Sequence, residues 1–224
     1  PNLKNIYRIF KKISMHIEYL QNLSKFKIKR KKFIVYFLHY QPEVTSIPLG
    51  KYFSNQILAI KYLAMNLPKG ISLLVKEHPM QLVSPYTLSI LCRYRGFYKN
   101  ISEIPNTSLI SATIPPSSLI EKSLATASLS GTIAFESIIK GVPSICLGES
   151  FLGDFIGIID KDLSSLEIKI KSNREILKDK KLLFENFLEY STKSFISNHK
   201  YEDCSVMAGR ESCLELIKKI IKIH

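Results

Sequence analysis

The chain has 224 residues, and 46% of them are hydrophobic, which is enough to build one large domain around a sizeable core. No apolar run is long enough for a membrane-spanning helix, which excludes such a helix within these residues. The formal net charge of +13 is unevenly spread, because residues 1–32 hold ten Lys or Arg and a single acidic residue. The remaining residues are therefore only mildly basic.

The start of the chain predicts a charged amphipathic segment. Apolar residues recur there at spacings of three and four, which predicts a helix over residues 3–23 that packs against a domain. The basic run Lys25–Lys32 follows. A solvated linker and a contact with an anionic membrane surface both stay open for this run. No nucleic-acid-binding motif accompanies it, so we expect no nucleic-acid partner.

The middle of the chain alternates between strand and helix patterns. This order predicts an α/β fold: a Rossmann-like parallel sheet with helices on both faces. We expect this Rossmann-like domain to span residues 33–160 and a helical region over 161–224 to pack on it. The expected strands are 33–38, 71–75, 107–110, 124–129 and 144–147, and the expected helices are 52–65, 86–101, 117–123, 133–140, 173–190 and 204–223.

Four widely spaced cysteines, with no CxxC pair, are typical of a reducing compartment and argue against a zinc site or a disulfide framework. We therefore expect a cytoplasmic protein, peripheral on the inner membrane if the basic run binds lipid, and no metal ion. The chain begins at Pro1 rather than Met, and we expect it to be part of a larger protein.

The turn between the strand 124–129 and the helix 133–140 is the first candidate site. Ser130, Gly131 and Thr132 combine a glycine, which lets a ligand approach the backbone, with two hydroxyl groups at a helix N-terminus. These features suit a phosphate. Glu136 lies one turn further and could accept hydrogen bonds from a ribose diol. Two alternatives stay open: Ser130 only caps the helix, and Glu136 pairs with Lys140.

Two loops that follow other strands supply further candidates. Pro79 stops the strand 71–75 and holds His78 extended at the strand's C-terminal end, where ligands bind in parallel sheets. We expect His78 to donate to a phosphate or a leaving group. Gln41 and Glu43 follow the strand 33–38 and could contact the sugar, or could only shape their turn.

Several of these stretches, in order, resemble the bacterial capsule polysaccharide biosynthesis glycosyltransferases, a group that includes enzymes using CMP-linked Kdo. The similarity covers roughly residues 33–151. It is carried by the following stretches: His39-Tyr40-Gln41-Pro42-Glu43, Lys76-Glu77-His78-Pro79, Ser130-Gly131-Thr132 with Glu136, Gly141-Val142-Pro143 and Leu147-Gly148.

The resemblance implies the GT-B architecture, in which two Rossmann-like domains face each other across a cleft, and this chain would be the C-terminal, donor-binding half. His78-Pro79 is similar to the His-Pro motif that bacterial sialyltransferases use on the CMP moiety. Ser130, Gly131 and Thr132 would hold the nucleotide phosphate. Glu136 is spaced from Ser130 like the ribose-binding glutamate of the non-hydrolysing UDP-GlcNAc 2-epimerases. The N-terminal acceptor domain, with any catalytic residue that it supplies, would be missing.

We therefore predict a glycosyltransferase that moves a sugar from a nucleotide-activated donor, such as CMP-Kdo, to a lipid-linked or polysaccharide acceptor. Helix amides, hydroxyl groups and His78 would stabilise the charge that develops on the leaving nucleotide, with no metal ion or cofactor. The catalytic base is not identified. A nucleotide-sugar 2-epimerase-like enzyme and a non-catalytic module anchored at the membrane surface stay open as alternatives.

Overall fold

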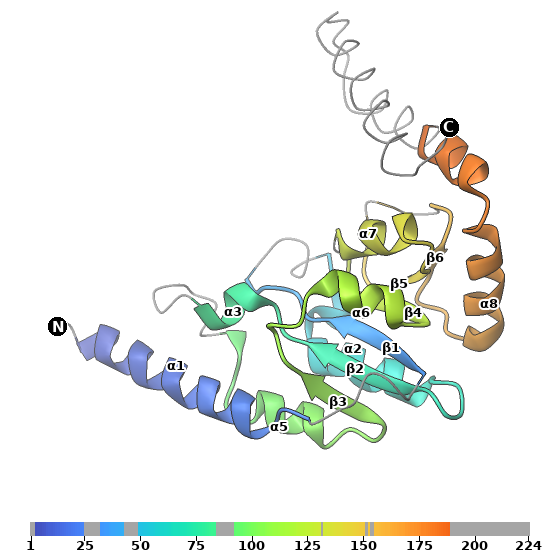
Figure 1. Cartoon of the computed structure of the whole chain (residues 1–224). Coiled ribbons are helices and arrows are strands. Elements are labelled where there is room, and N and C mark those ends of the chain that lie inside the picture. The colour runs from blue at the N-terminus through green and yellow to red at the C-terminus, as the bar shows by residue number, and fades with distance from the viewer. Residues whose placement is uncertain are drawn as a thin grey trace, which may run out of the picture.

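The computed structural model describes residues 3–24, 32–42, 49–83, 92–130, 132–150, 152 and 155–188, in which strands and helices alternate along the chain (Figure 1). The elements are α1 (Leu3–Gln21), β1 (Phe33–Phe37), η2 (Lys51–Ser54), α2 (Gln56–Met65), β2 (Ser72–Lys76), α3 (Pro79–Val83), α5 (Phe97–Ser102), β3 (Thr107–Ile110), α6 (Pro116–Lys122), β4 (Ala125–Ser128), α7 (Ile133–Ile139), β5 (Ser144–Cys146), β6 (Ile158–Ile159) and α8 (Leu166–Ile176).

The strands form one six-stranded sheet in the order β3-β2-β1-β4-β5-β6, and every neighbouring pair is parallel. The chain runs outward from β1 through β2 to β3, and then crosses back to place β4 on the other side of β1. Such a reversal opens a crevice at the C-terminal ends of the strands beside it, where ligands bind. The predicted Rossmann-like α/β fold is confirmed.

Helices cover both faces of the sheet, because the strands are apolar on both sides. Ile34 and Tyr36 of β1 face a core that also contains buried residues of α1, α2, α5 and α8. Phe33, Val35 and Phe37 face the opposite way, toward a cluster with residues of α6. A third cluster surrounds α7 and includes Phe155 and Leu177. The alternation along β1 therefore separates the face covered by α1, α2, α5 and α8 from the face covered by α6.

The predicted helix over 86–101 is wrong at its centre. Cys92 is helical, but the chain leaves the helix over residues 93–96 and α5 begins at Phe97. Gly96, just before α5, adopts a left-handed conformation with φ of 89°. The carboxylate of Glu18 on α1 accepts hydrogen bonds from the N–H groups of Gly96, Tyr98 and Lys99. The only acidic residue of the basic N-terminal segment therefore caps α5 and fixes α1 to the domain.

Two other predicted helices are interrupted. The helix expected over 52–65 divides into η2 and α2, because the Asn55 side chain accepts from the N–H of Ile57 and starts α2 there. The helix expected over 173–190 begins earlier, as α8, ends at Ile176 and resumes over 180–188 after a turn. At this second break the Asp179 side chain accepts from the N–H of Leu182, as Asn55 does for Ile57. Hydrophobic periodicity does not reveal such side-chain caps.

Several predictions lie outside the described residues. These concern most of the basic run (25–31), Glu43, Gly131 and the helix expected over 204–223. Within the described part of the chain, none of the helices combines the length and the hydropathy that crossing a membrane requires.

Gly148 after β5 sits where three loops approach one another. A Cβ atom at this position would lie 2.9 Å from the carbonyl oxygen of Leu49 and 3.2 Å from that of Leu129. Gly148→Ala is therefore expected to lower the free energy of unfolding by roughly 1–3 kcal/mol, because backbone cannot yield as a side chain can. Urea denaturation measures this change. Glu149→Ala, which removes only an exposed ion pair with Lys51, is the control and should cost about 0–1 kcal/mol. Equal stability of the two variants would contradict the predicted clash.

Candidate functional site

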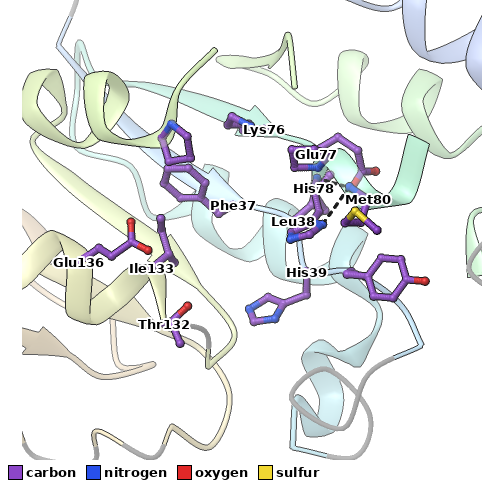
Figure 2. Close-up of a pocket in the computed structure, with 13 residues that line it drawn as sticks. Phe37, Leu38, His39, Lys76, Glu77, His78, Met80, Thr132, Ile133 and Glu136 are labelled. Carbon is purple, nitrogen blue, oxygen red and sulfur yellow. Dashed lines mark hydrogen bonds between the residues drawn. The ribbon is translucent and has the colours of Figure 1, made fainter. Parts of the chain in front are cut away.

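A cavity of about 500 Å³ opens at the C-terminal edge of the sheet, beside the reversal of strand order. It lies where β1 and β2 end opposite the start of α7 (Figure 2). Its lining consists of Phe37, Leu38, His39 and Tyr40 after β1, Lys76, Glu77, His78, Pro79 and Met80 at the end of β2, and Pro116, Thr132, Ile133 and Glu136.

Four of the predicted site residues surround this one space. Figure 2 shows His78 and Met80 on one side and Thr132 and Glu136 on the other. His78 and Pro79 come from the end of β2, whereas Thr132 and Glu136 come from the helix after β4. The parallel sheet brings these segments together because its strands end at a common edge.

The hydrogen bonds around His78 orient its imidazole. Its Nδ1 accepts the backbone N–H of Met80 at 3.2 Å, and its ring lies 5.8 Å from that of Tyr40. Its own backbone N–H donates to Glu77 Oε1 at 2.7 Å. A neutral imidazole that accepts at Nδ1 carries its proton on Nε2, so this arrangement makes Nε2 a hydrogen-bond donor.

In the part of the chain that the structure describes, neither a helix cap nor an ion pair occupies the side chains of Thr132 and Glu136. Thr132 stands at the N-cap position of α7, but its side chain makes no capping hydrogen bond. The pairing of Glu136 with Lys140 is not formed, because Lys140 Nζ binds Glu121 Oε1 at 2.5 Å. Among the residues that the structure describes, Glu136 forms no ion pair. Its exposed carboxylate is therefore available at the cavity, close to the positive end of the helix dipole.

Ser130 lies differently from what the sequence suggests. It is buried and does not line the cavity. The backbone N–H groups of Leu129 and Ser130 point at His39 Nε2, at 3.1 and 3.4 Å. These two amides therefore hold an imidazole that follows β1. Thr132, not Ser130, is the hydroxyl group at the cavity.

Gln41 is part of the framework beneath the cavity. Its amide nitrogen donates to the carbonyl oxygen of Ser54, and its amide oxygen accepts from Arg93 Nη1 at 2.7 Å. Its backbone N–H donates to Gln81 Oε1. With both ends of its side chain bonded inside the protein, Gln41 does not line the cavity, and the alternative that it shapes its own turn describes it better.

Arg93 and Glu77 form a fully buried ion pair under the same loops. Arg93 Nε and Nη2 donate to the two Glu77 oxygens, each at 3.0 Å, and Nη2 also donates to the carbonyl oxygen of His39. The Tyr98 hydroxyl donates to Glu77 Oε2 at 2.8 Å. Burial alone would lower the pKa of Arg93, but the adjacent Glu77 carboxylate outweighs it and raises that pKa. The pair connects the loop after β1 to the end of β2.

Lys76 adds positive charge to the cavity lining. It is the last residue of β2, it is buried, and its Nζ donates to the carbonyl oxygen of Ala112 at 2.8 Å. Burial lowers the pKa of Lys76, against the opposing effect of Glu77. The sequence signal that could have identified Lys76 as a site residue is its place at the end of an apolar strand. A lysine there is expected to be buried, and buried lysines are rare without a specific partner.

The described part of the chain contains no group of three or more His, Cys, Asp or Glu side chains that could hold a metal ion. The ionisable and hydroxyl side chains that line the cavity are two imidazoles, one ammonium, two hydroxyl groups and two carboxylates: His39, His78, Lys76, Tyr40, Thr132, Glu77 and Glu136.

Several solved structures are similar to this chain at low sequence identity, among them the following three. Two are KpsC of Thermosulfurimonas dismutans, as a β-Kdo 2,7 transferase and as a β-Kdo 2,4 transferase. Each is 16% identical, with TM-scores of 0.44 and 0.43, over 70% and 71% of this chain and 49% and 50% of theirs. The third is TarM, 16% identical with a TM-score of 0.42, over 79% of this chain and 35% of its own.

The chain thus spans about half the length of the two KpsC chains. No curated protein sequence matches it. The sequence model of one family, described as capsule polysaccharide biosynthesis protein, matches residues 9–201. Because that match covers most of the chain, this protein belongs to the capsule polysaccharide biosynthesis family.

Proposed function

We propose that this chain is the donor-binding half of a GT-B glycosyltransferase and that the cavity holds the nucleotide of an activated sugar. The observation that carries the proposal is that His78 and Thr132 line one cavity, although they follow different strands. Membership of the capsule polysaccharide biosynthesis family supports a glycosyltransferase. The chemistry of the cavity supports binding of the nucleotide donor as the role of this half. An anionic leaving group is the ligand that these donors suit.

In this proposal the nucleotide phosphate lies between the His78 Nε2–H and the first turn of α7. The N–H groups of that turn and the Thr132 hydroxyl contact it from one side, and Gly131 permits the close approach. Lys76 offsets phosphate charge from the lining of the cavity. The donors therefore stand ready for the charge that develops on the leaving nucleotide, without a metal ion.

Glu136, which lines the same cavity, then accepts hydrogen bonds from the ribose diol. A carboxylate repels a phosphate group, so in this proposal Glu136 binds hydroxyl groups of the ligand and not its phosphate. Glu43 remains a proposed contact to the sugar. CMP-linked Kdo is the donor to test first, because the KpsC neighbours are Kdo transferases and the motifs resemble CMP-Kdo enzymes.

Thr132→Val is expected to weaken nucleotide binding about tenfold, because valine keeps the shape of the side chain but removes its hydrogen-bonding hydroxyl. Calorimetry with CMP, CDP, UDP and GDP in parallel tests the site and the nucleotide class together. Thr107→Val, at the opposite edge of the sheet, is the matched control and should bind like the unchanged chain. Absence of binding by all four nucleotides would overturn the proposal, and equal effects of the two variants would remove Thr132 from the site.

The acceptor and the catalytic base belong, in this proposal, to a second Rossmann-like domain across the cleft. A lipid-linked or polysaccharide acceptor would place the enzyme at the cytoplasmic face of the membrane. Nucleotide release that depends on an added acceptor supports transfer. Conversion of the nucleotide sugar without any acceptor would instead identify an epimerase of the same architecture.

A further inference from the structure

The outward face of α1 is an apolar ridge. Its large side chains recur at spacings of three and four, which places them on one side of the helix. They are Tyr7 (63% exposed), Phe10 (68%), Ile13 (50%), Ile17 (48%) and Leu20 (53%). Met15 and Tyr19, on the opposite side of the helix, are buried in the main core. The ridge therefore points away from the domain.

The inward side of α1 fixes the helix in this orientation. Glu18 caps α5, and the Tyr19 hydroxyl accepts from the Ala112 N–H at 2.6 Å. Lys12 Nζ donates to the carbonyl oxygen of Val83 at 2.6 Å. Figure 1 shows the C-terminal end of α1 (blue) beside α5 at the edge of the domain, with the N-terminal end of α1 projecting beyond the sheet. The helix is attached by polar contacts and presents its apolar side outward.

The positive charge of the N-terminal segment favours an anionic surface as the partner of the ridge. Residues 1–32 carry ten cations against one acidic residue, so two copies packed through this ridge would bring two strongly positive segments together. A bilayer that contains anionic lipid offers both an apolar layer for the ridge and negative headgroups for the cations. Long Lys and Arg side chains can reach those headgroups while the helix lies in the interface.

We propose that α1 is an in-plane anchor, which inserts Phe10, Ile13 and Ile17 into the surface of an anionic bilayer. This inference is independent of the nucleotide cavity. The apolar side chains of α1 insert into the bilayer, whereas the basic run Lys25–Lys32 adds only electrostatic attraction. Apolar insertion resists salt and electrostatic attraction does not, so the two contributions can be separated.

The chain contains no tryptophan, so a single introduced indole reports its own surroundings. Phe10→Trp is expected to show a blue-shifted emission when the protein meets vesicles of phosphatidylcholine with phosphatidylglycerol, and no shift with phosphatidylcholine alone. Met65→Trp, at a residue 85% exposed on α2, is the control and should not shift. An unshifted Phe10→Trp in bound protein would overturn the insertion.

Removing the ridge tests the same proposal by co-sedimentation. The variant Phe10→Ser/Ile13→Ser/Ile17→Ser should lose binding to the anionic vesicles about tenfold or more, and part of the binding of the unchanged chain should survive high salt. Met65→Ser/Ile168→Ser removes two exposed apolar side chains elsewhere and should bind fully. Far-UV circular dichroism checks that each variant is folded. Unchanged vesicle binding by the triple variant overturns the proposal. So does a triple variant that still binds vesicles but changes from dimer to monomer, or that still binds vesicles but loses an acidic protein partner.

Discussion

Arg93→Met is expected to lower the free energy of unfolding by about 3–5 kcal/mol, because it leaves the fully buried Glu77 carboxylate without its cation. The substitution also removes the hydrogen bonds to the carbonyl oxygen of His39 and to Gln41. Methionine fills similar space, so the loss comes from charge and hydrogen bonding rather than from a void. Urea denaturation of this chain measures it.

A double variant tests whether the loss of stability comes from leaving the Glu77 charge unpaired. Arg93→Met/Glu77→Leu removes both charges and should recover part of the loss, since a buried pair replaced by apolar residues is often neutral. Lys99→Met breaks an exposed pair with Glu103 and should cost about 0–1 kcal/mol. If Arg93→Met changed stability no more than Lys99→Met, the buried pair would not hold the two strand ends together.

The sheet could be predicted from the sequence because its strands are apolar on both faces and are bounded by turn residues. The expected strand 107–110 agrees with β3, and the strand 33–38 with β1. Helix ends were less predictable, since they depend on contacts between distant segments. Glu18 caps α5 from a position about eighty residues away along the chain, and no local pattern shows this.

The candidate site was predictable where it follows from topology. His78 and Thr132 lie at strand ends that a parallel sheet must bring to one edge. The tasks of Ser130 and Gln41 were not predictable, because each is set by a partner from another loop: His39 for one and Arg93 for the other. Hydrogen-bonding residue types in a loop look alike in sequence, whether they bind a ligand or the protein itself.

Removal of the His78 imidazole is expected to slow the transfer of the sugar. In the complete enzyme, His78→Ala is expected to lower kcat for acceptor-dependent release of the nucleotide by about 10²–10³, the usual effect of removing one donor to developing negative charge. The Met80 N–H at His78 Nδ1 supports this expectation, because it leaves the proton on Nε2. Measuring free nucleotide against time, with saturating donor and acceptor, gives the rate.

The role of His78 as a donor, rather than as a packing residue, requires a finer comparison. His78→Gln keeps an N–H group of similar reach and should recover part of the rate, whereas His78→Phe keeps the ring and should not. His16→Ala, at an exposed histidine on α1, is the control and should transfer at the unchanged rate. Equal rates for His78→Phe and the unchanged enzyme would show that the ring alone matters. If all three His78 variants bind nucleotide normally and transfer slowly, the donor acts on the leaving group as charge develops and not on the bound substrate.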